Sequence, residues 1–457
     1  MSGNTLRLMA EPIAITGLGV VSAFGVGIEA FWDGLTTGRC MIREPETLDA
    51  SSFACQLAAE APPLAMKDHL PKHYRKFARV MARDIELAVV AAYEAAASAR
   101  LGTGEDETRA YEPHRLGTHI GAALLAPEIP ELARAMHAAK GDDSTWDMHA
   151  WGETGMGQLT PLWMLKYLPN MLACHVSILH EAKGPSNTIT AGEASGLLSI
   201  GEAMRVIERG DADASLAGSG DSRVNHLAIE RLCLVGRLAE TRALGQVDPA
   251  TLVRPFSPDA IGSVPGEGAA VCVLERANAA ESRGVEQIAT LLGFGASQAV
   301  PPLSDGAPVM AGLGASAGGT ADGLDDALTQ AMRSALRDAG TDPSAIDAIF
   351  CHGAGERALD EAEQRALHAV FGDRASEIEL CFLSPMLGET MAAGGSLLLA
   401  AAALALRHRS LPARPRGGAA PDDLRASAAE SRVATLEGVL VCTHALGGQC
   451  AAVVLGR

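Results

Sequence analysis

Three titratable side chains stand in glycine-containing motifs where they could do chemistry. Glu193 lies in the sequence AGEASG, a few residues before an amphipathic helical pattern at 200–209. His352 opens the sequence HGAGE, and Glu389 ends the sequence SPMLGE. Carboxylates and imidazoles can transfer protons. A carboxylate cannot store an acyl group for later transfer, because a glutamyl anhydride would hydrolyse.

Composition and charge exclude several classes of partner. The chain has 457 residues, 48% of them hydrophobic, which is enough for an extensive core. Its formal net charge of −18 argues against nucleic acid and, more weakly, against an anionic membrane surface. One basic stretch stands out, and we interpret it as a solvated helix face rather than a docking patch. It comprises Lys67, Lys72, Arg75, Lys76, Arg79 and Arg83.

Cysteine usage and hydropathy indicate a cytoplasmic protein. The nine cysteines include no CxxC pair, so we expect reduced, buried thiols and no metal cluster. The first residues lack the apolar core of a signal peptide. The longest apolar run, 391–406, is rich in Ala and Gly and ends in Arg407-His408-Arg409. We expect it to be a buried core helix rather than a membrane span.

The hydrophobic patterns alternate between strands and helices through the whole chain. This alternation predicts an α/β fold with mostly parallel strands. The segment 301–323, rich in Gly, Ala, Pro and Ser, and the segment 411–423 are predicted to be loops. The predicted strands are 12–21, 115–121, 212–220, 269–274, 346–350 and 438–442, and the predicted helices are 31–35, 82–97, 200–209, 325–339, 360–371 and the run after Glu389.

Several motifs in the same order resemble the thiolase-fold condensing enzymes, the β-ketoacyl-ACP synthase family, over roughly residues 10 to 456. The motifs are TGLGVVS at 16–22, PNM at 169–171, GPSNT at 184–188 with the Glu193 sequence, RPFS at 254–257, GEGA at 266–269, HGAGE at 352–356 with Asp360 and Glu363, and the glycine pair 447–448. The resemblance implies a five-layer α-β-α-β-α fold built from two similar halves. We place these halves at 1–253, with the elbow that holds Glu193, and at 254–457, with the histidine-type motifs.

The resemblance also assigns the candidate site. In this family an elbow cysteine and two histidines meet in one pocket, and here Glu193, His352 and Glu389 occupy those three positions. The lysine of the second histidine motif is replaced by Ser384. The substrate-facing segment before the end of the chain is represented by His444, Leu446, Gly447 and Gly448.

These replacements indicate that the polypeptide does not elongate an acyl chain alone. Claisen condensation needs a thiolate to hold the acyl group and histidine N–H donors to stabilise an enolate. Glu193 cannot hold the chain, and an ionised Glu389 would repel the enolate. The resemblance implies a subunit of the chain-length-factor type in type II polyketide or fatty-acid-like biosynthesis. Its expected partners are a cysteine-bearing ketosynthase, as a heterodimer, and an acyl carrier protein.

Two alternatives remain open. Glu193, His352 and Glu389 could run acid–base or decarboxylation chemistry on an acyl thioester, with one carboxylate raising the pKa of the other. A divalent metal between them is a weaker variant of that idea, and neither a metal nor a cofactor is expected. The other alternative is a homodimeric scaffold without a catalytic role.

Other residues of the motifs are predicted to be structural. Asp360 and Glu363 are expected to form ion pairs or to cap neighbouring elements, and Arg254 and Glu267 to belong to a structural network. The region 151–167, rich in Trp and Met, is expected to face a partner subunit, as the resemblance implies.

Overall fold

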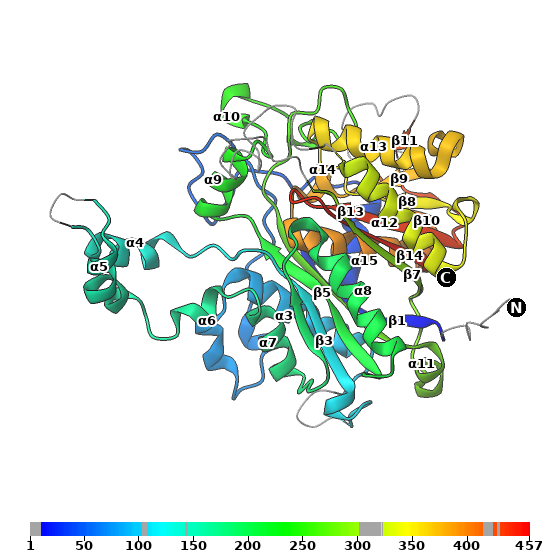
Figure 1. The fold of residues 1–457 in the computed structure, drawn as a ribbon, viewed down its shortest axis with the longest axis horizontal. Helices are drawn as coiled ribbons and strands as arrows, with labels where there is room; N and C mark the ends of the chain where they lie inside the picture. The colour runs from blue at the N-terminus through cyan, green and yellow to red at the C-terminus, as the bar shows by residue number, and fades with distance from the viewer. Residues whose placement is uncertain are drawn as a thin grey trace, which may run out of the picture.

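The computed structural model describes residues 11–102, 108–141, 145–300, 321, 323–414, 424–426 and 430–457. The predicted loops at 301–323 and 411–423 therefore lie mostly outside the described residues. Within these ranges, the strands pair into one large twisted sheet, and helices pack on its faces (Figure 1). The strands are β1 Ile13–Ser22, β2 Gly25–Val26, β3 Leu116–Gly121, β4 Ser186–Ile189, β5 Ala214–Ser222, β6 Glu267–Arg276, β7 Ala289–Gln298, β8 Ala348–Phe350, β9 Glu379–Cys381, β10 Ser410–Leu411, β11 Arg425–Ala426, β12 Arg432–Val433, β13 Gly438–His444 and β14 Gln449–Gly456.

Ten of the twelve strands of the sheet form two equivalent five-stranded units, and the short strands β2 and β11 pair with β1 and β9. The first has the order β4-β3-β5-β6-β1 and the second the order β9-β8-β13-β14-β7. In each unit the first three strands are parallel and the last two join antiparallel. β1 and β7 join the units through three antiparallel residue pairs, from Ile13 with Leu291 to Ile15 with Ala289. The internal repeat predicted from the sequence is thus confirmed.

The prediction of mostly parallel strands was wrong. β6, β1, β7 and β14 are all antiparallel to their neighbours. Parallel strands need a long crossover, usually a helix, whereas antiparallel strands can follow a tight turn. β13 and β14 are joined by such a turn, and the hydrophobic patterns did not predict strands at β7 or β14.

Helices complete the five layers expected from the resemblance. α8 and α15 lie in contact between the two units, α3 and α7 cover the outside of the first, and α12 and α13 cover the second (Figure 1). The helices are α1 Ile28–Thr36, α2 Met66–His69, α3 Arg83–Ser98, α4 Ile129–Ala138, α5 Met148–Ala150, α6 Trp163–Tyr167, α7 Met171–Leu179, α8 Ser195–Glu208, α9 His226–Leu234, α10 Thr241–Leu244, α11 Ala277–Arg283, α12 Leu324–Ala339, α13 Arg357–Phe371, α14 Ser384–Leu387 and α15 Gly394–His408.

Glycines let the outer helices approach the central strands closely. A Cβ built on Gly19 of β1 would lie 1.9 Å from the carbonyl oxygen of Ala91 in α3. A Cβ built on Gly295 of β7 would lie 2.1 Å from the carbonyl oxygen of Ala331 in α12. Both distances are far below van der Waals contact. The same small-residue packing therefore fixes the outer helix of each unit.

The apolar run at 391–406 is part of a buried core helix, as predicted. Met391–His408 is long and apolar enough to cross a membrane, but 78% of it is buried inside the protein. That burial is typical of a core helix, and α15 packs against β6 of one unit and β13 of the other.

The predicted division after residue 253 assigns β6 to the C-terminal half, whereas β6 is hydrogen-bonded between β1 and β5 of the first unit.

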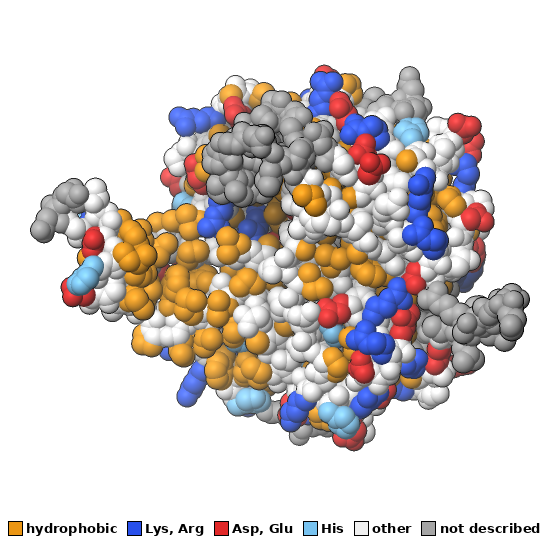
Figure 2. All heavy atoms as spheres, in the orientation of Figure 1, with side chains coloured by type: hydrophobic (Ala, Val, Ile, Leu, Met, Phe, Trp, Pro, Cys, Tyr) orange, Lys and Arg blue, Asp and Glu red, His pale blue; other side chains and the backbone are white. Residues whose placement is uncertain are grey.

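An arm formed by α4, α5 and α6 extends from the first unit (Figure 1). Between α5 and α6 it contains a π-helix, Trp151–Gly155, and a 3-10 turn, Met156–Gln158. Figure 2 shows hydrophobic side chains gathered over this arm and the adjoining surface of the first unit. We use the name apolar face for the exposed large hydrophobic residues of the arm and its neighbouring segments, which are Leu124, Ile129, Met136, Trp146, Met148, Met156, Leu162, Met164 and Ile178.

Candidate functional site

The elbow that carries Glu193 is a tight connection from β4 into α8. A 3-10 turn, Gly192–Ala194, precedes the helix, and Gly192 has φ +55°, in the left-handed region that favours glycine. The Ser195 hydroxyl accepts a hydrogen bond from the backbone N–H of Ala191 (2.8 Å) and donates to the Gly192 carbonyl (2.7 Å). These contacts hold Glu193 at the N-terminus of α8, where the helix dipole favours a negative charge.

Glu193 is buried, with 2% of its surface exposed. Its Oε1 lies 3.2 Å from Nη1 of Arg237. Its Oε2 accepts a hydrogen bond of 3.3 Å from the backbone N–H of Leu446. The carboxylate therefore points inward at the place where the resemblance puts a nucleophile.

His352 follows β8, and its loop is fixed by Glu363 of α13. The two oxygens of Glu363 accept hydrogen bonds from the backbone N–H groups of His352 (3.0 Å) and Gly353 (2.9 Å). The imidazole Nδ1 lies 3.0 Å from the backbone carbonyl oxygen of His444, and Nε2 lies 3.2 Å from Glu389. Both ring nitrogens thus have acceptors within the protein.

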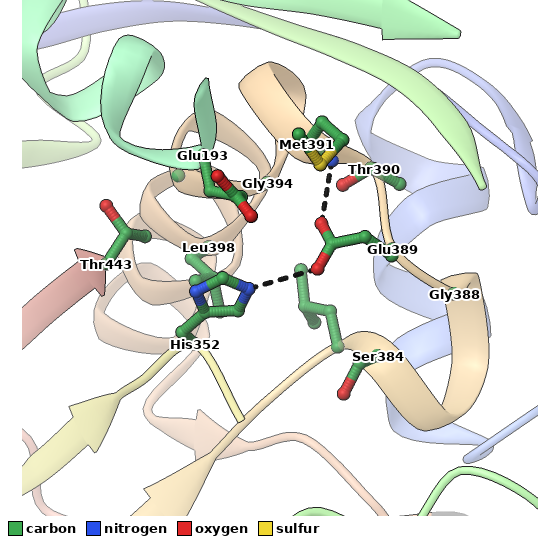
Figure 3. Close-up of a pocket in the computed structure, with 12 residues that line it drawn as sticks. Glu193, His352, Ser384, Gly388, Glu389, Thr390, Met391, Gly394, Leu398 and Thr443 are labelled. Carbon is green, nitrogen blue, oxygen red and sulfur yellow. Dashed lines mark hydrogen bonds and ion pairs between the residues drawn. The ribbon is translucent and has the colours of Figure 1, made fainter. Parts of the chain in front are cut away.

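Glu389 stands between α14 and the 3-10 turn Met391–Ala393 that leads into α15. Its Oε1 accepts a hydrogen bond of 2.8 Å from the backbone N–H of Met391. Its Oε2 accepts from Nη2 of Arg237 (2.9 Å) and from Nε2 of His352. Figure 3 shows Glu193, His352 and Glu389 pointing toward one another, as the resemblance predicted.

Arg237 joins the two carboxylates, and no sequence motif predicted it. It lies in the loop after α9, with 3% of its side chain exposed. That loop is held by two backbone hydrogen bonds: the N–H of Ser263 donates to the carbonyl of Arg237 (3.0 Å), and the N–H of Ala239 donates to the carbonyl of Ser263 (2.8 Å). One guanidinium therefore connects Glu193, at the start of α8, with Glu389, ahead of α15. We call Glu193, Arg237, Glu389 and His352 the Arg237 cluster.

The charges in the Arg237 cluster stabilise one another. Burial disfavours the imidazolium, but the hydrogen bond and charge of Glu389 outweigh it and raise the pKa of His352 to about 9. Burial also disfavours the Glu389 carboxylate, but His352 and Arg237 outweigh it and lower the pKa of Glu389 to about 2. At neutral pH His352 is therefore a cation and Glu389 an anion. Neither group titrates near the pH at which an acid–base catalyst would work.

The space that remains in the pocket is about 30 Å³. That volume accommodates roughly one water molecule. It is lined by the Arg237 cluster's carboxylates and imidazole together with residues of α14 and α15, among them Ser384, Thr390, Met391 and Leu398. An acyl chain cannot enter such a space unless the cluster opens.

The C-terminal segment supports the site through its backbone. His444 is completely buried, its ring centroid lies 4.4 Å from that of His352, and burial lowers the pKa of its imidazole. Leu446 contributes the N–H that binds Glu193, and Gly448 has φ +83° at the turn between β13 and β14. The structure thus brings His444 and Leu446 to the site, and whether this segment binds substrate stays a prediction.

The remaining predicted structural residues bind within the protein. Asp360 accepts hydrogen bonds from the backbone N–H groups of Phe256 (2.9 Å) and Gly355 (3.2 Å). Glu267 pairs with Arg83 at 2.8 Å. Asp360 and Glu363 therefore bind backbone amides and not basic side chains, with the exception of a 3.7 Å approach of Glu363 to His444.

Metal binding receives no support from the part of the chain that the structure describes. No group of three His, Cys, Asp or Glu side chains there could hold a metal ion. The Arg237 guanidinium occupies the position between the Glu193 and Glu389 carboxylates where a metal ion would have to bind. A sequence signal for such a residue did exist, because two carboxylates placed in a buried pocket require a nearby positive charge. The sequence could not show which of the 37 Lys and Arg residues supplies it.

The fold and the site define a thiolase-like α/β protein of the condensing-enzyme class, with a glutamate at the elbow. Two family models match the chain: β-ketoacyl synthase N-terminal domain over residues 10–280 and C-terminal domain over residues 309–416. The chain therefore belongs to the β-ketoacyl synthase family.

Curated relatives include both fatty-acid and polyketide proteins. A 3-oxoacyl-[acyl-carrier-protein] synthase 2 of Staphylococcus aureus is 29% identical over 396 residues, which are 86% of this chain and 85% of the relative. An actinorhodin polyketide putative β-ketoacyl synthase 1 of Streptomyces coelicolor is 31% identical over 97% of this chain and 88% of the relative.

Solved structures match the chain over almost its whole length. The ishigamide ketosynthase/chain length factor superimposes with a TM-score of 0.76 at 26% identity and covers 98% of this chain and 99% of its own. A β-ketoacyl synthase from Burkholderia phymatum gives 0.77 at 26% identity with the same coverage. A ketosynthase in complex with its type II PKS acyl-carrier protein gives 0.77 at 22% identity, which supports the fold alone.

Proposed function

We propose that this chain is a non-elongating ketosynthase-like subunit of the chain-length-factor type. It pairs with a cysteine-bearing ketosynthase in type II polyketide or fatty-acid-like biosynthesis and helps to shape the acyl tunnel. The observation that carries the proposal is the Arg237 cluster, which fills the position of the catalytic residues with paired charges.

Each requirement of condensation is unmet in this cluster. The elbow side chain cannot form a thioester, and it is bound to Arg237 and to the Leu446 N–H. The His352 nitrogens have acceptors at Glu389 and His444, so no free N–H points at a developing enolate oxygen. The Glu389 carboxylate is ionised and would repel that oxygen. The same engagement of all three groups argues against the acid–base alternative.

Two surface features of the first unit favour a protein partner. β4 pairs with β3 and is the end strand of its unit, and among the described residues no strand pairs with its other edge. The apolar face lies on the same side of the molecule as the arm (Figure 2). Contiguous exposed apolar area of this kind marks interaction sites. A second ketosynthase-fold chain is the partner that we propose for it, and a second copy of this chain is the other candidate.

Reconstitution with a cysteine-bearing ketosynthase tests the proposal. We expect the two chains to co-purify and to form product from malonyl-loaded carrier protein, with isotope-labelled acyl groups bound only to the partner. Glu193→Gln should leave product formation within about twofold, since the amide keeps the hydrogen bond from Leu446 and no covalent step depends on the carboxylate.

Two outcomes would contradict the proposal. One is loss of product with Glu193→Gln while the complex still assembles, which would favour independent chemistry at Glu193. The other is labelled acyl group covalently bound to this chain and then extended. A stable homodimer that fails to bind any ketosynthase would support the scaffold alternative.

A further inference from the structure

A second cavity lies on the outer side of the first unit, beside α3 and the end of α7, which pack against each other (Figure 1). Its volume is about 350 Å³, against about 30 Å³ in the pocket of the Arg237 cluster, and no described residue lines both. It borders the apolar face, because Ile178 belongs to both. A cavity of this size can accommodate a small organic molecule.

One wall of the cavity is the basic stretch that the sequence predicted to be a solvated helix face. The structure has instead the four-residue α2 and the six-residue 3-10 turn Arg75–Val80, and neither is long enough to present a continuous helical face. The connection between them lines the cavity, and its residues Leu70 and Tyr74 are buried in the core beside α3. The wall is therefore anchored from beneath.

The inner part of the cavity is apolar. Val89 of α3 is 1% exposed and Leu70 is 3% exposed, and Leu179 of α7 packs against the same core cluster. The hydroxyl of Tyr74 is already engaged, since it shares a hydrogen bond of 2.7 Å with Nδ1 of His175. A ligand that reaches these side chains must place a hydrophobic part of itself against them, because a polar group buried there would lack a partner.

Two rings stand at the outer part of the cavity. Tyr93 is 44% exposed on α3, and His69 meets it edge to face, with ring centroids 5.9 Å apart and planes 81° apart. Nδ1 of His69 makes no hydrogen bond to any residue that the structure describes, and the nearby carboxylate oxygen of Glu94 is 4.0 Å away. Aromatic rings of this kind bind a flat ligand by stacking, and the imidazole nitrogen can bind a hydroxyl group.

The charged groups of the cavity disfavour an anionic ligand. Arg109 forms an ion pair of 2.8 Å with Glu181, so its charge is already neutralised. Asp68 contributes a second carboxylate. Burial lowers the pKa of His180 to about 4, so this imidazole adds no positive charge at neutral pH. A carboxylate, sulfonate or phosphate group would therefore be repelled more than attracted.

We propose that this cavity binds a small neutral aromatic molecule that carries a phenolic hydroxyl group. The ring of the ligand packs between Tyr93 and the apolar floor, and its hydroxyl group supplies the hydrogen bond that His69 lacks. A sugar of similar size fits less well, because some of its hydroxyl groups would be left unpaired against Val89 and Leu70. A metal ion receives no support, since no group of three ligating side chains in the described residues could hold one. The inference goes beyond the proposed function and does not depend on a ketosynthase partner.

Isothermal titration calorimetry of the full chain with β-naphthol tests this inference. We expect one saturable site, and binding at least tenfold weaker for β-naphthalenesulfonate, in which a negative charge replaces the hydroxyl group of the same ring system. Tyr93→Ala should weaken β-naphthol binding at least tenfold, and His69→Leu about fivefold. Trp146→Ala is the matched control, because Trp146 is 45% exposed but lies in the arm; its affinity should stay within about twofold of the wild type.

Equal affinity of the wild type and Tyr93→Ala for β-naphthol would overturn the inference. So would the absence of saturable binding, or a preference for β-naphthalenesulfonate or glucose over β-naphthol. An equal loss with Trp146→Ala would place the binding on the apolar face and overturn it as well. Tyr93 is exposed, so its replacement should leave the fold intact, and circular dichroism checks this. None of these outcomes affects pairing with a ketosynthase, which is measured separately by co-purification.

Discussion

At the scale of single residues, Arg237 determines whether the pocket is an acid–base site or a structural ion network. Two buried carboxylates without a cation would raise each other's pKa and could share a proton, as acid–base sites do. With the guanidinium between them, and with His352 protonated beside Glu389, the charges are paired, and Arg237 meets Glu193 through an ion pair without a hydrogen bond. The cluster therefore resembles a structural ion network in the place of an active site.

Removing the central cation should destabilise the protein. Arg237→Met leaves Glu193 and Glu389 buried without their partner, and breaking a buried pair in this way costs about 3–5 kcal/mol. Urea unfolding at one protein concentration measures the loss. Arg357→Met is the control and should change stability by less than about 0.5 kcal/mol, since its ion pair is exposed. If Arg237→Met matched that control, the carboxylates would not depend on the guanidinium.

The pKa values predict a pH dependence of stability. The pKa of His352 is raised above its unfolded value of 6.5 to about 9, so its contribution is complete below pH 6.5 and is lost as the pH rises through 9. The pKa of Glu389 is lowered to about 2, so its contribution is present above pH 4.5 and is lost as the pH falls toward 2.

Urea midpoints at pH 6 and pH 9.5 check the histidine part of this prediction. The wild type should lose about 1–3 kcal/mol more than His352→Gln between these pH values. Cysteines and tyrosines that also titrate in this range are common to both proteins and cancel. Parallel pH profiles would show that His352 is not held as a cation by Glu389.

The sequence identified three of the four residues in the cluster because they stand in motifs whose order along the chain is characteristic of a family. Arg237 stands in no such motif. It is 152 positions from Glu389 and reaches it from a loop whose path depends on long-range packing. Its role follows from three-dimensional contacts that neither periodicity nor spacing encodes.

At the scale of the elements, glycine-to-helix contacts fix the outer layers. Strand and helix positions were largely predictable, because period-2 and period-3.6 patterns are local. Strand directions were not, since β1 pairs with β6 and β7, whose paired residues are 248 to 278 positions away in sequence. The repeat becomes clear only when the two units are compared strand by strand.

Gly19→Ala and Gly295→Ala should destabilise the protein by similar amounts. Each added methyl group would overlap a carbonyl oxygen of α3 or α12, and such overpacking costs about 1–3 kcal/mol. Gly157→Ala is the control, because nothing lies within 4 Å of its added Cβ. Thermal unfolding of the three variants measures the effect. A neutral result at Gly19 with a large loss at Gly295 would show that the two units do not pack alike.

At the scale of the whole molecule, the apolar face covers the arm and the adjoining surface of the first unit (Figure 2). Leu162 is 62% exposed and Met164 56% exposed, both in the arm. Their exposure would be unfavourable in an isolated subunit, which supports the proposal that a partner covers them.

Leu162→Lys/Met164→Lys should abolish co-purification with a ketosynthase partner or weaken it at least tenfold, because two charges would be buried at the interface. Leu234→Lys is the control: this leucine is 71% exposed at the end of α9, outside the apolar face. Size-exclusion chromatography with light scattering measures the assembly. Intact assembly of the arm variant would move the interface elsewhere on the surface.

The central layer has a consequence for how the protein is made. α8 is synthesised with the first unit, but the surface that it turns toward the second unit is covered only when α15 arrives, 186 residues after α8 ends. When the first unit leaves the ribosome, the hydrophobic side of α8 that faces the second unit is exposed to solvent. This surface stays exposed while most of the second unit is translated. A truncated product ending after β6 is therefore expected to need chaperones, and folding of the full-length chain finishes only with its last strands.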